Sequence, residues 1–255
     1  MTVPGRLEVD AATGRVTGPA RITWNDPFPT ANGSWGSGKM TGVVMHTQVG
    51  NNPGTVAWFN NPASEASADF CIAQDGSIVQ MGPIGKGWIA WAQAAGNPEW
   101  YSIEHADDGN PANPLTEAQI AASAQLVEVL SRFAGFPAQI SNSVDTPGYG
   151  IHSMGGEAWG DHPACPGPVR ANQRGTITAL ARQMREKPVA VKHWRTLAPV
   201  SFAGVAERHG TTPERMTELA AAAGHEYDAK VKAIIEAKDW GKHLPIGTEL
   251  YAPAR

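Results

Sequence analysis

The chain has 255 residues, of which 42% are hydrophobic and 17% are charged, the composition of a folded globular protein with one sizeable domain and a smaller one. The formal net charge of -4 argues against nucleic acid or anionic membrane as a partner, because proteins that bind either one usually carry a basic face. Two cysteines are too few for the disulfide framework of a small secreted protein, so we expect a reducing folding compartment.

The N-terminal segment lacks the basic start and the apolar run of a signal peptide, and no window has the length of a membrane span. We therefore expect a chain that is made in the cytoplasm and does not insert into a membrane. If it works outside the cell, another protein must let it out.

The first strand is predicted where a short apolar run begins. Residues 1–40 are rich in glycine, proline, asparagine and threonine, which predicts an irregular lead-in lying over that strand. Residues 41–47 then predict a buried strand that carries His46 at its end.

A hairpin and a further strand are predicted next. Residues 68–81 contain two β-rich runs on either side of Asp75-Gly76, a dipeptide that favours a tight turn. Residues 101–106 are also typical of a strand, and they include Glu104.

Two amphipathic helices are predicted in the second half of this region. Apolar residues recur at three- and four-residue intervals over residues 115–134, where Thr116 can cap the start and Gly135 can stop the end. Residues 172–185 show the same period and predict a second helix.

The chain is predicted to divide near a Lys-Pro dipeptide. Residues 1–188 are predicted to form the main domain, with its core at about 40–186, and residues 189–194 are the best candidate for a linker. Residues 195–255 form the tail, in which residues 202–219 predict a helix, a turn and a helix, and residues 244–251 predict a closing strand.

Two histidines and a cysteine form a candidate zinc site. His46 ends a predicted strand, His152 follows a glycine-containing run, and Cys165 precedes Pro166-Gly167. Any one of these histidines alone is more often structural, but imidazole and thiolate together are ligands that zinc prefers. Three protein ligands leave one tetrahedral position open, which is the pattern of a catalytic site.

The candidates for a general base and for substrate contacts are less specific. Glu104 can take a proton from water, but its neighbours Asp107 and Asp108 are equally acidic, and an exposed strand carboxylate is the more common role. Tryptophans near the motifs suit stacking on sugar rings, although core packing is their commoner use, so we expect only one or two to contact a ligand. The candidates among them are Trp88, Trp91 and Trp159.

Residues 40–186 resemble the type 2 N-acetylmuramoyl-L-alanine amidases, the family shared by bacteriophage lysins and peptidoglycan recognition proteins. The segments that carry the resemblance, in chain order, are Val43-Val-Met-His46, Ala66-Ser-Ala-Asp-Phe with Asp75-Gly76 and Val79-Gln80, Ser102-Ile-Glu104, His152, and Ala164-Cys-Pro-Gly167. Their order and spacing are much more specific than any single motif.

The resemblance implies an α/β fold of the α+β type, in which helices flank a mixed β-sheet. It also implies a Zn²⁺ ion bound by His46, His152 and Cys165, with Glu104 in the place of the family's catalytic glutamate. The implied reaction is hydrolysis of the amide bond between the lactyl group of N-acetylmuramic acid and L-alanine.

The sequence departs from this family at two positions. Family members often have a lysine two residues before the third ligand, where Pro163 stands here, and His162 is the natural substitute as the cation that stabilises the oxyanion. His162 is equally well interpreted as a second-layer or surface histidine. Family members also commonly place a histidine after the tryptophan, where this chain has Trp91-Ala-Gln93.

The tail resembles the LysM domain, a small βααβ module that binds glycans containing N-acetylglucosamine. Residues 201–212 match its first helix and turn, and residues 244–251 match its last strand. Pro199-Val200 replaces the usual Gly-Asp, and residues 224–243 are longer than the module requires.

Together these features predict a bacteriophage endolysin with a zinc amidase domain and a LysM-like wall-binding domain. Its expected partner is bacterial peptidoglycan, both muramyl peptide and glycan strands, and it is expected to be a monomer that is released through a separate membrane-permeabilising protein. The alternatives are a non-catalytic peptidoglycan-recognition protein, which the presence of Cys165 disfavours, and a zinc peptidase that cuts within the stem peptide.

Overall fold

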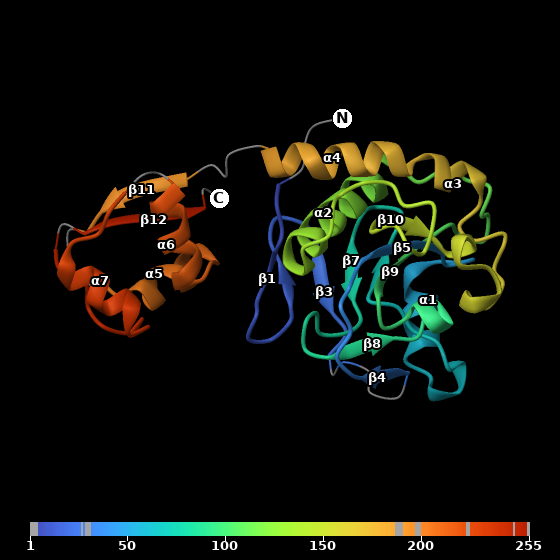
Figure 1. The fold of residues 1–255 in the computed structure, drawn as a ribbon, viewed down its shortest axis with the longest axis horizontal. Helices are drawn as coiled ribbons and strands as arrows, with labels where there is room; N and C mark the ends of the chain where they lie inside the picture. The colour runs from blue at the N-terminus through green and yellow to red at the C-terminus, as the bar shows by residue number, and fades with distance from the viewer. Residues whose placement is uncertain are drawn as a thin grey trace. The chain divides into compact units, whose positions relative to one another are not determined.

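The computed structural model describes residues 5–26, 28, 32–186, 191–196, 200–222, 225–246 and 248–253. The described chain separates into two compact units, residues 1–186 and 187–255 (Figure 1). Among the described residues, no helix is long and apolar enough to cross a membrane.

The first unit is built on a six-stranded mixed sheet, which confirms the predicted fold class. Its strands run in the order β10-β5-β9-β6-β7-β3, and all neighbours are parallel except the antiparallel pair β6 and β7. In that order the strands are Gly148–Ile151, Gly42–Thr47, Trp100–His105, Phe70–Ile72, Ile78–Gln80 and Ile22–Trp24.

The predicted irregular lead-in is wrong, because strand β3 lies within it at the edge of the main sheet. Residues 1–40 also contain β1 (Glu8–Val9) paired with β2 (Val16–Thr17), and β4 (Gly33–Trp35) paired with β8 (Trp88–Ala90). These strands have two or three residues each, which is too short for an alternating pattern to be recognised.

Apolar side chains on one face of the sheet pack against two long helices, α2 (Glu117–Ala134) and α4 (Arg174–Glu186), which lie side by side in Figure 1. Helix α2 begins at a capping box between Thr116 and Gln119 and ends at Gly135 in a left-handed conformation, as predicted. The second predicted helix, residues 172–185, is confirmed as α4, and a short helix that was not predicted, α3 (Pro168–Asn172), precedes it.

The opposite face of the sheet is covered by shorter elements. They are α1 (Asn52–Phe59) and the 3-10 helices Pro62–Ser64, Ala94–Gly96 and His152–Trp159. Two small apolar clusters lie here, one around Cys71 and Phe59 and the other around Val44 and Trp100. On this face Glu104, near the carboxyl end of β9, is partly exposed.

The second unit has its own core and differs from the predicted βααβ module. Strands β11 (Val191–Arg195) and β12 (Glu249–Pro253) pair antiparallel. The described residues between them form three helices rather than two: α5 (Phe202–His209), α6 (Pro213–Ala222) and α7 (Ala229–Glu236). The core residues include Phe202, Val205, Met216, Leu219, Val231 and Leu250.

Two predictions for this region are therefore corrected. Residues 191–194, placed in the predicted linker, belong to β11, and residues 189–190 lie outside the described part of the chain. Three of the five residues of β11 are polar, so backbone pairing with β12 rather than an apolar pattern defines it. The extra length at 224–243 is helix α7, which the side chain of Asp228 caps.

Candidate metal centre

Strand register brings the first ligand and the candidate base together. His46 on β5 pairs with Glu104 on β9, and Glu104 pairs in turn with Cys71 on β6. Because the strands are parallel and in register, these three side chains lie on the same face of the sheet. That face is the one opposite α2 and α4.

The other two candidate ligands come from the segment after β10, the strand next to β5. His152 directly follows β10, and the main-chain N–H of Ser153 donates to the carbonyl of Cys165 at 3.1 Å. This hydrogen bond holds the chain at Cys165 against the start of the 3-10 helix His152–Trp159. Cys165 therefore lies beside His152 although 12 residues separate them in the sequence.

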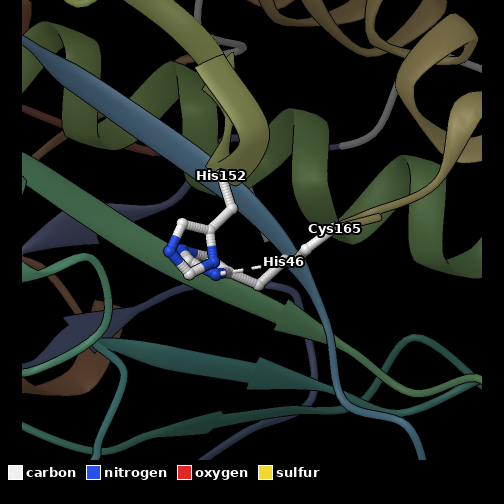
Figure 2. Close-up of side chains that lie close together, drawn as sticks. All are labelled: His46, His152 and Cys165. Atoms are coloured by element: carbon white, nitrogen blue, oxygen red, sulfur yellow. Dashed lines mark hydrogen bonds between the residues drawn. The ribbon is translucent and has the colours of Figure 1, made fainter. Parts of the chain in front are cut away.

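The three side chains converge, as Figure 2 shows. The Nδ1 atom of His46 lies 4.0 Å from the Sγ atom of Cys165, and one ligand atom from each of the three residues lies within 4.8 Å of the others. In a tetrahedral zinc site with ordinary bond lengths, a nitrogen and a sulfur ligand are about 3.6 Å apart. A small contraction would thus complete the geometry, and the predicted ligands fit the ion.

Hydrogen bonds and burial prepare both histidines for a metal. The Nε2 atom of His152 lies 2.9 Å from the carbonyl of Trp159, which can only accept, so Nε2 carries the proton and Nδ1 of the neutral ring has a free lone pair. Burial lowers the pKa of His152 to about 4 and that of His46 well below its ordinary value. Both rings are therefore neutral at pH 7, the form that binds metals.

Without a bound cation, the Cys165 thiol keeps its proton at neutral pH. Burial, together with the nearby Glu104 carboxyl, raises the pKa of this thiol to about 12. A divalent cation reverses that effect, because a coordinated thiol loses its proton outright. Metal binding here is therefore expected to release a proton from Cys165.

The structure distinguishes Glu104 from its acidic neighbours. Its Oε2 atom is buried and has no hydrogen-bond partner among the described residues. Burial and the nearby Asp107 raise the pKa of Glu104 to about 8. Asp107 instead accepts hydrogen bonds from the Thr47 hydroxyl and the Gly50 N–H, so it holds the loop after β5, and Asp108 is exposed.

Glu104 also lines a pocket of about 460 Å³ between the loop after β5 and helix α1. Two apolar side chains at this pocket are unusually exposed, Val49 at 69% and Trp58 at 55%. Sequence reasoning missed Trp58 because it missed α1. The signal was Asn51, which caps this helix two residues before Pro53, an arrangement typical of a helix start.

Two of the three tryptophans predicted to contact substrate are buried. Trp88 and Trp159 are each 4% exposed, and Trp159 packs edge-on against Trp100 with ring centroids 5.6 Å apart. Neighbouring glycines make room for the rings, since a Cβ at Gly155 would overlap Trp159. Trp91 is partly exposed and donates weakly to Ser34 at 3.4 Å.

His162 lies next to the site and is exposed. Its ring centroid is 4.4 Å from that of His152, with 33° between the ring planes. This position agrees with either predicted role, the cationic donor or a neighbour of the ligands, and its catalytic role stays a prediction.

Arg170 is a buried residue of the site that no sequence motif indicated. Its guanidinium donates to the Thr47 hydroxyl at 3.0 Å and to the main-chain carbonyls of His105 at 3.1 Å and Ala106 at 3.2 Å. It therefore ties the carboxyl ends of β5 and β9 together from α3. A single arginine in a short helix gives no pattern from which this role could be predicted.

On the mixed sheet, two histidines and a cysteine lie close enough together to bind a metal ion, beside a glutamate whose Oε2 atom is buried. Residues 36–168 match the family model of N-acetylmuramoyl-L-alanine amidase, and the chain belongs to this family. An amidase of that name, amidase A from Achromobacter lyticus, is 32% identical over 127 residues, which are 49% of this chain and 69% of the relative.

Solved structures with a similar fold include two bacterial hydrolases. The Staphylococcus aureus hydrolase AmiA, in complex with its ligand, is 16% identical with a TM-score of 0.47, over 66% of this chain and 83% of that one. The amidase LysC from Clostridium intestinale is 17% identical with a TM-score of 0.45, over 63% of this chain and 97% of that one.

Proposed function

We propose that this chain is a zinc-dependent N-acetylmuramoyl-L-alanine amidase that acts as a bacteriophage endolysin. The observation that carries the proposal is the convergence of His46, His152 and Cys165 beside the unpartnered Oε2 of Glu104. Family membership supports peptidoglycan as the substrate. The zinc dependence and the phage role are the further steps proposed here.

The donor set favours zinc over a harder cation. One thiolate and two neutral imidazoles suit a borderline-soft ion, whereas magnesium and calcium prefer oxygen ligands. Bound zinc supplies Lewis-acid chemistry: it polarises a carbonyl and makes water acidic enough to lose a proton near neutral pH.

Glu104 moves the proton. In its ionised form the carboxylate accepts a proton from the attacking water, and it returns this proton to the leaving amine nitrogen of L-alanine. The buried Oε2 atom suits this exchange, because no hydrogen bond from the described part of the chain competes for it. Glu104 also lines the adjacent pocket, together with Trp58 and Val49, so we place part of the substrate there.

The test combines metal content with product analysis. Wild type is expected to hold one zinc per chain and to release a new L-alanine amino terminus from purified peptidoglycan. Cys165→Ala is expected to lose zinc and lysis together. A new amino terminus inside the stem peptide would instead identify a peptidase, and wall binding without zinc or lysis would identify a recognition protein.

We also propose that the C-terminal unit keeps the enzyme at the wall by binding its glycan. The resemblance of residues 201–212 and 244–251 to LysM segments supports this, and a second weak contact raises the effective concentration of an enzyme at an insoluble substrate. Soluble N-acetylglucosamine oligomers are expected to compete the full chain off purified wall without slowing cleavage of a small muramyl peptide. Unchanged wall binding at saturating oligomer would overturn this part of the proposal.

A further inference from the structure

The side chain of Gln93 connects the main chain of β9 to the ligand His46. Gln93 is 1% exposed and lies just before the 3-10 helix Ala94–Gly96. Its Nε2 atom donates to the carbonyl of Trp100 at 2.7 Å, and its Oε1 atom lies 3.2 Å from Nε2 of His46. The one amide thus contacts a strand carbonyl at one end and the imidazole at the other.

The Trp100 carbonyl determines which way this amide points. A carbonyl only accepts hydrogen bonds, so the NH₂ end of Gln93 must face Trp100 and the oxygen end must face His46. An amide oxygen also only accepts, so Nε2 of His46 must carry the ring proton. In a neutral imidazole the other nitrogen is then unprotonated, and in His46 that nitrogen is Nδ1, which faces Cys165.

A turn holds Gln93 itself in place. The side-chain oxygen of Asn97 accepts hydrogen bonds from the main-chain N–H groups of Ala92 at 3.0 Å and Gln93 at 2.7 Å. The Gly96 N–H donates to the Gln93 carbonyl at 2.8 Å, which closes the turn. The amide is therefore presented to His46 from a fixed backbone.

We propose that Gln93 is a positioning residue of the metal centre, which fixes His46 in the tautomer and ring orientation that direct Nδ1 at the ion. The inference rests on the proposed zinc site but not on which bond the enzyme cuts. For His152 the same role falls to the main-chain carbonyl of Trp159, which no substitution removes. Of the two histidines, His46 is the one whose orientation depends on a replaceable side chain.

The test is the zinc dissociation constant of the full chain, measured by competition with a chromogenic chelator. Gln93→Leu removes the acceptor and is expected to bind zinc about 10- to 100-fold more weakly, the usual effect of losing a hydrogen bond to a ligating histidine. Gln93→Glu keeps the acceptor for His46 and, when its buried carboxyl is protonated, also a donor to the Trp100 carbonyl, so it is expected to bind zinc about as tightly as wild type. The matched control is Gln125→Leu, since Gln125 is also a buried glutamine but bonds to the Gly5 carbonyl.

The visible spectrum of the cobalt-substituted protein gives a readout independent of activity. Gln93→Leu is expected to change the cobalt bands, while Gln125→Leu is expected to reproduce the wild-type spectrum. Equal zinc affinity and equal spectra in folded Gln93→Leu and wild type would overturn the inference. If Gln93→Leu does not fold, a tenfold loss of affinity in Gln93→Glu overturns it instead, whereas wild type that takes up no zinc overturns the proposed function as well.

Discussion

The two faces of the main sheet differ in what they hold, although the same strands supply both. On β5 and β9, Met45 and Ile103 pair with each other and enter the apolar core beneath α2 and α4. The next residue of each strand, His46 or Glu104, points to the opposite face and enters the candidate site. One face therefore packs into the apolar core, while the other carries the buried and partly buried polar groups of the candidate site.

The largest expected effect on the site face is that of Glu104→Gln. This change removes the proposed base and is expected to lower the rate of peptidoglycan hydrolysis by about 10²- to 10⁴-fold, with one zinc still bound. Stability is expected to stay the same or rise, because the amide avoids the cost of a buried charge. The control is Glu99→Gln, because Glu99 is an exposed carboxylate just before β9. If Glu104→Gln keeps most of the wild-type rate, Glu104 is not the base.

For the neighbouring residue, Ile103, we expect a substitution to lower stability and to leave the metal site unaffected. Ile103→Ala leaves a cavity in the core and is expected to lower the free energy of unfolding by about 2–5 kcal/mol. Zinc affinity of the folded protein is expected to stay unchanged. Urea unfolding of the metal-free protein, followed by zinc titration, measures both quantities, and a loss of metal affinity without a loss of stability would contradict the separation of the two faces.

Asp69 is a buried carboxyl on the same face of the sheet as the candidate site, and it is expected to make the stability of the protein depend on pH. Burial raises the pKa of Asp69 to about 7, and hydrogen bonds from Ser102 only partly offset this. The folded state then binds more protons than the unfolded state between about pH 4 and pH 7, so this group makes the protein less stable as pH rises through that window.

The variant Asp69→Asn is expected to remove this contribution while keeping an oxygen that can accept from Ser102. The difference in unfolding free energy between wild type and variant is expected to change by up to about 1.4 kcal/mol per pH unit between pH 4 and pH 7. Denaturant unfolding across that range measures it. A difference that does not vary with pH would show that Asp69 keeps an ordinary pKa.

The smallest expected effect is that of Trp58→Ala at the pocket. Loss of an exposed indole is expected to raise KM a few-fold, with kcat and zinc content unchanged, because in the proposed binding mode the ring contacts substrate without touching the reacting bond. Trp35→Ala is the control, since Trp35 is 61% exposed but does not line the pocket. Equal kinetics for the two variants would place the substrate elsewhere.

The sequence predicted the parts of the fold and site that leave a local pattern. Helix α2 has an apolar period and a capping box, the hairpin has Asp75-Gly76, and His46 ends an apolar run. The candidate zinc ligands could be grouped by their chemistry and by a family resemblance but not by their proximity, because β10 and β5 become neighbours through pairing that no local pattern reveals. Their proximity is a product of the sheet topology.

The parts that could not be predicted depend on the packed structure. Arg170 and Gln93 donate hydrogen bonds to main-chain carbonyls. Because every residue type has such a carbonyl, the sequence does not indicate which residue accepts the bond. Trp88 and Trp159 look the same in sequence whether they face a groove or the core. The structure shows that both rings belong to the core, because they pack against glycines that have no room for a Cβ.

The positions of the ligands along the chain give a bound ion a second effect besides catalysis. His46 and Cys165 are 119 residues apart in sequence, so a metal that joins them closes a loop through most of the first unit. Like a disulfide of that span, such a cross-link restricts the unfolded chain, and any ligand that binds only the folded state adds stability in proportion to the logarithm of its concentration. The supply of zinc would then set how long the enzyme survives as well as how fast it works.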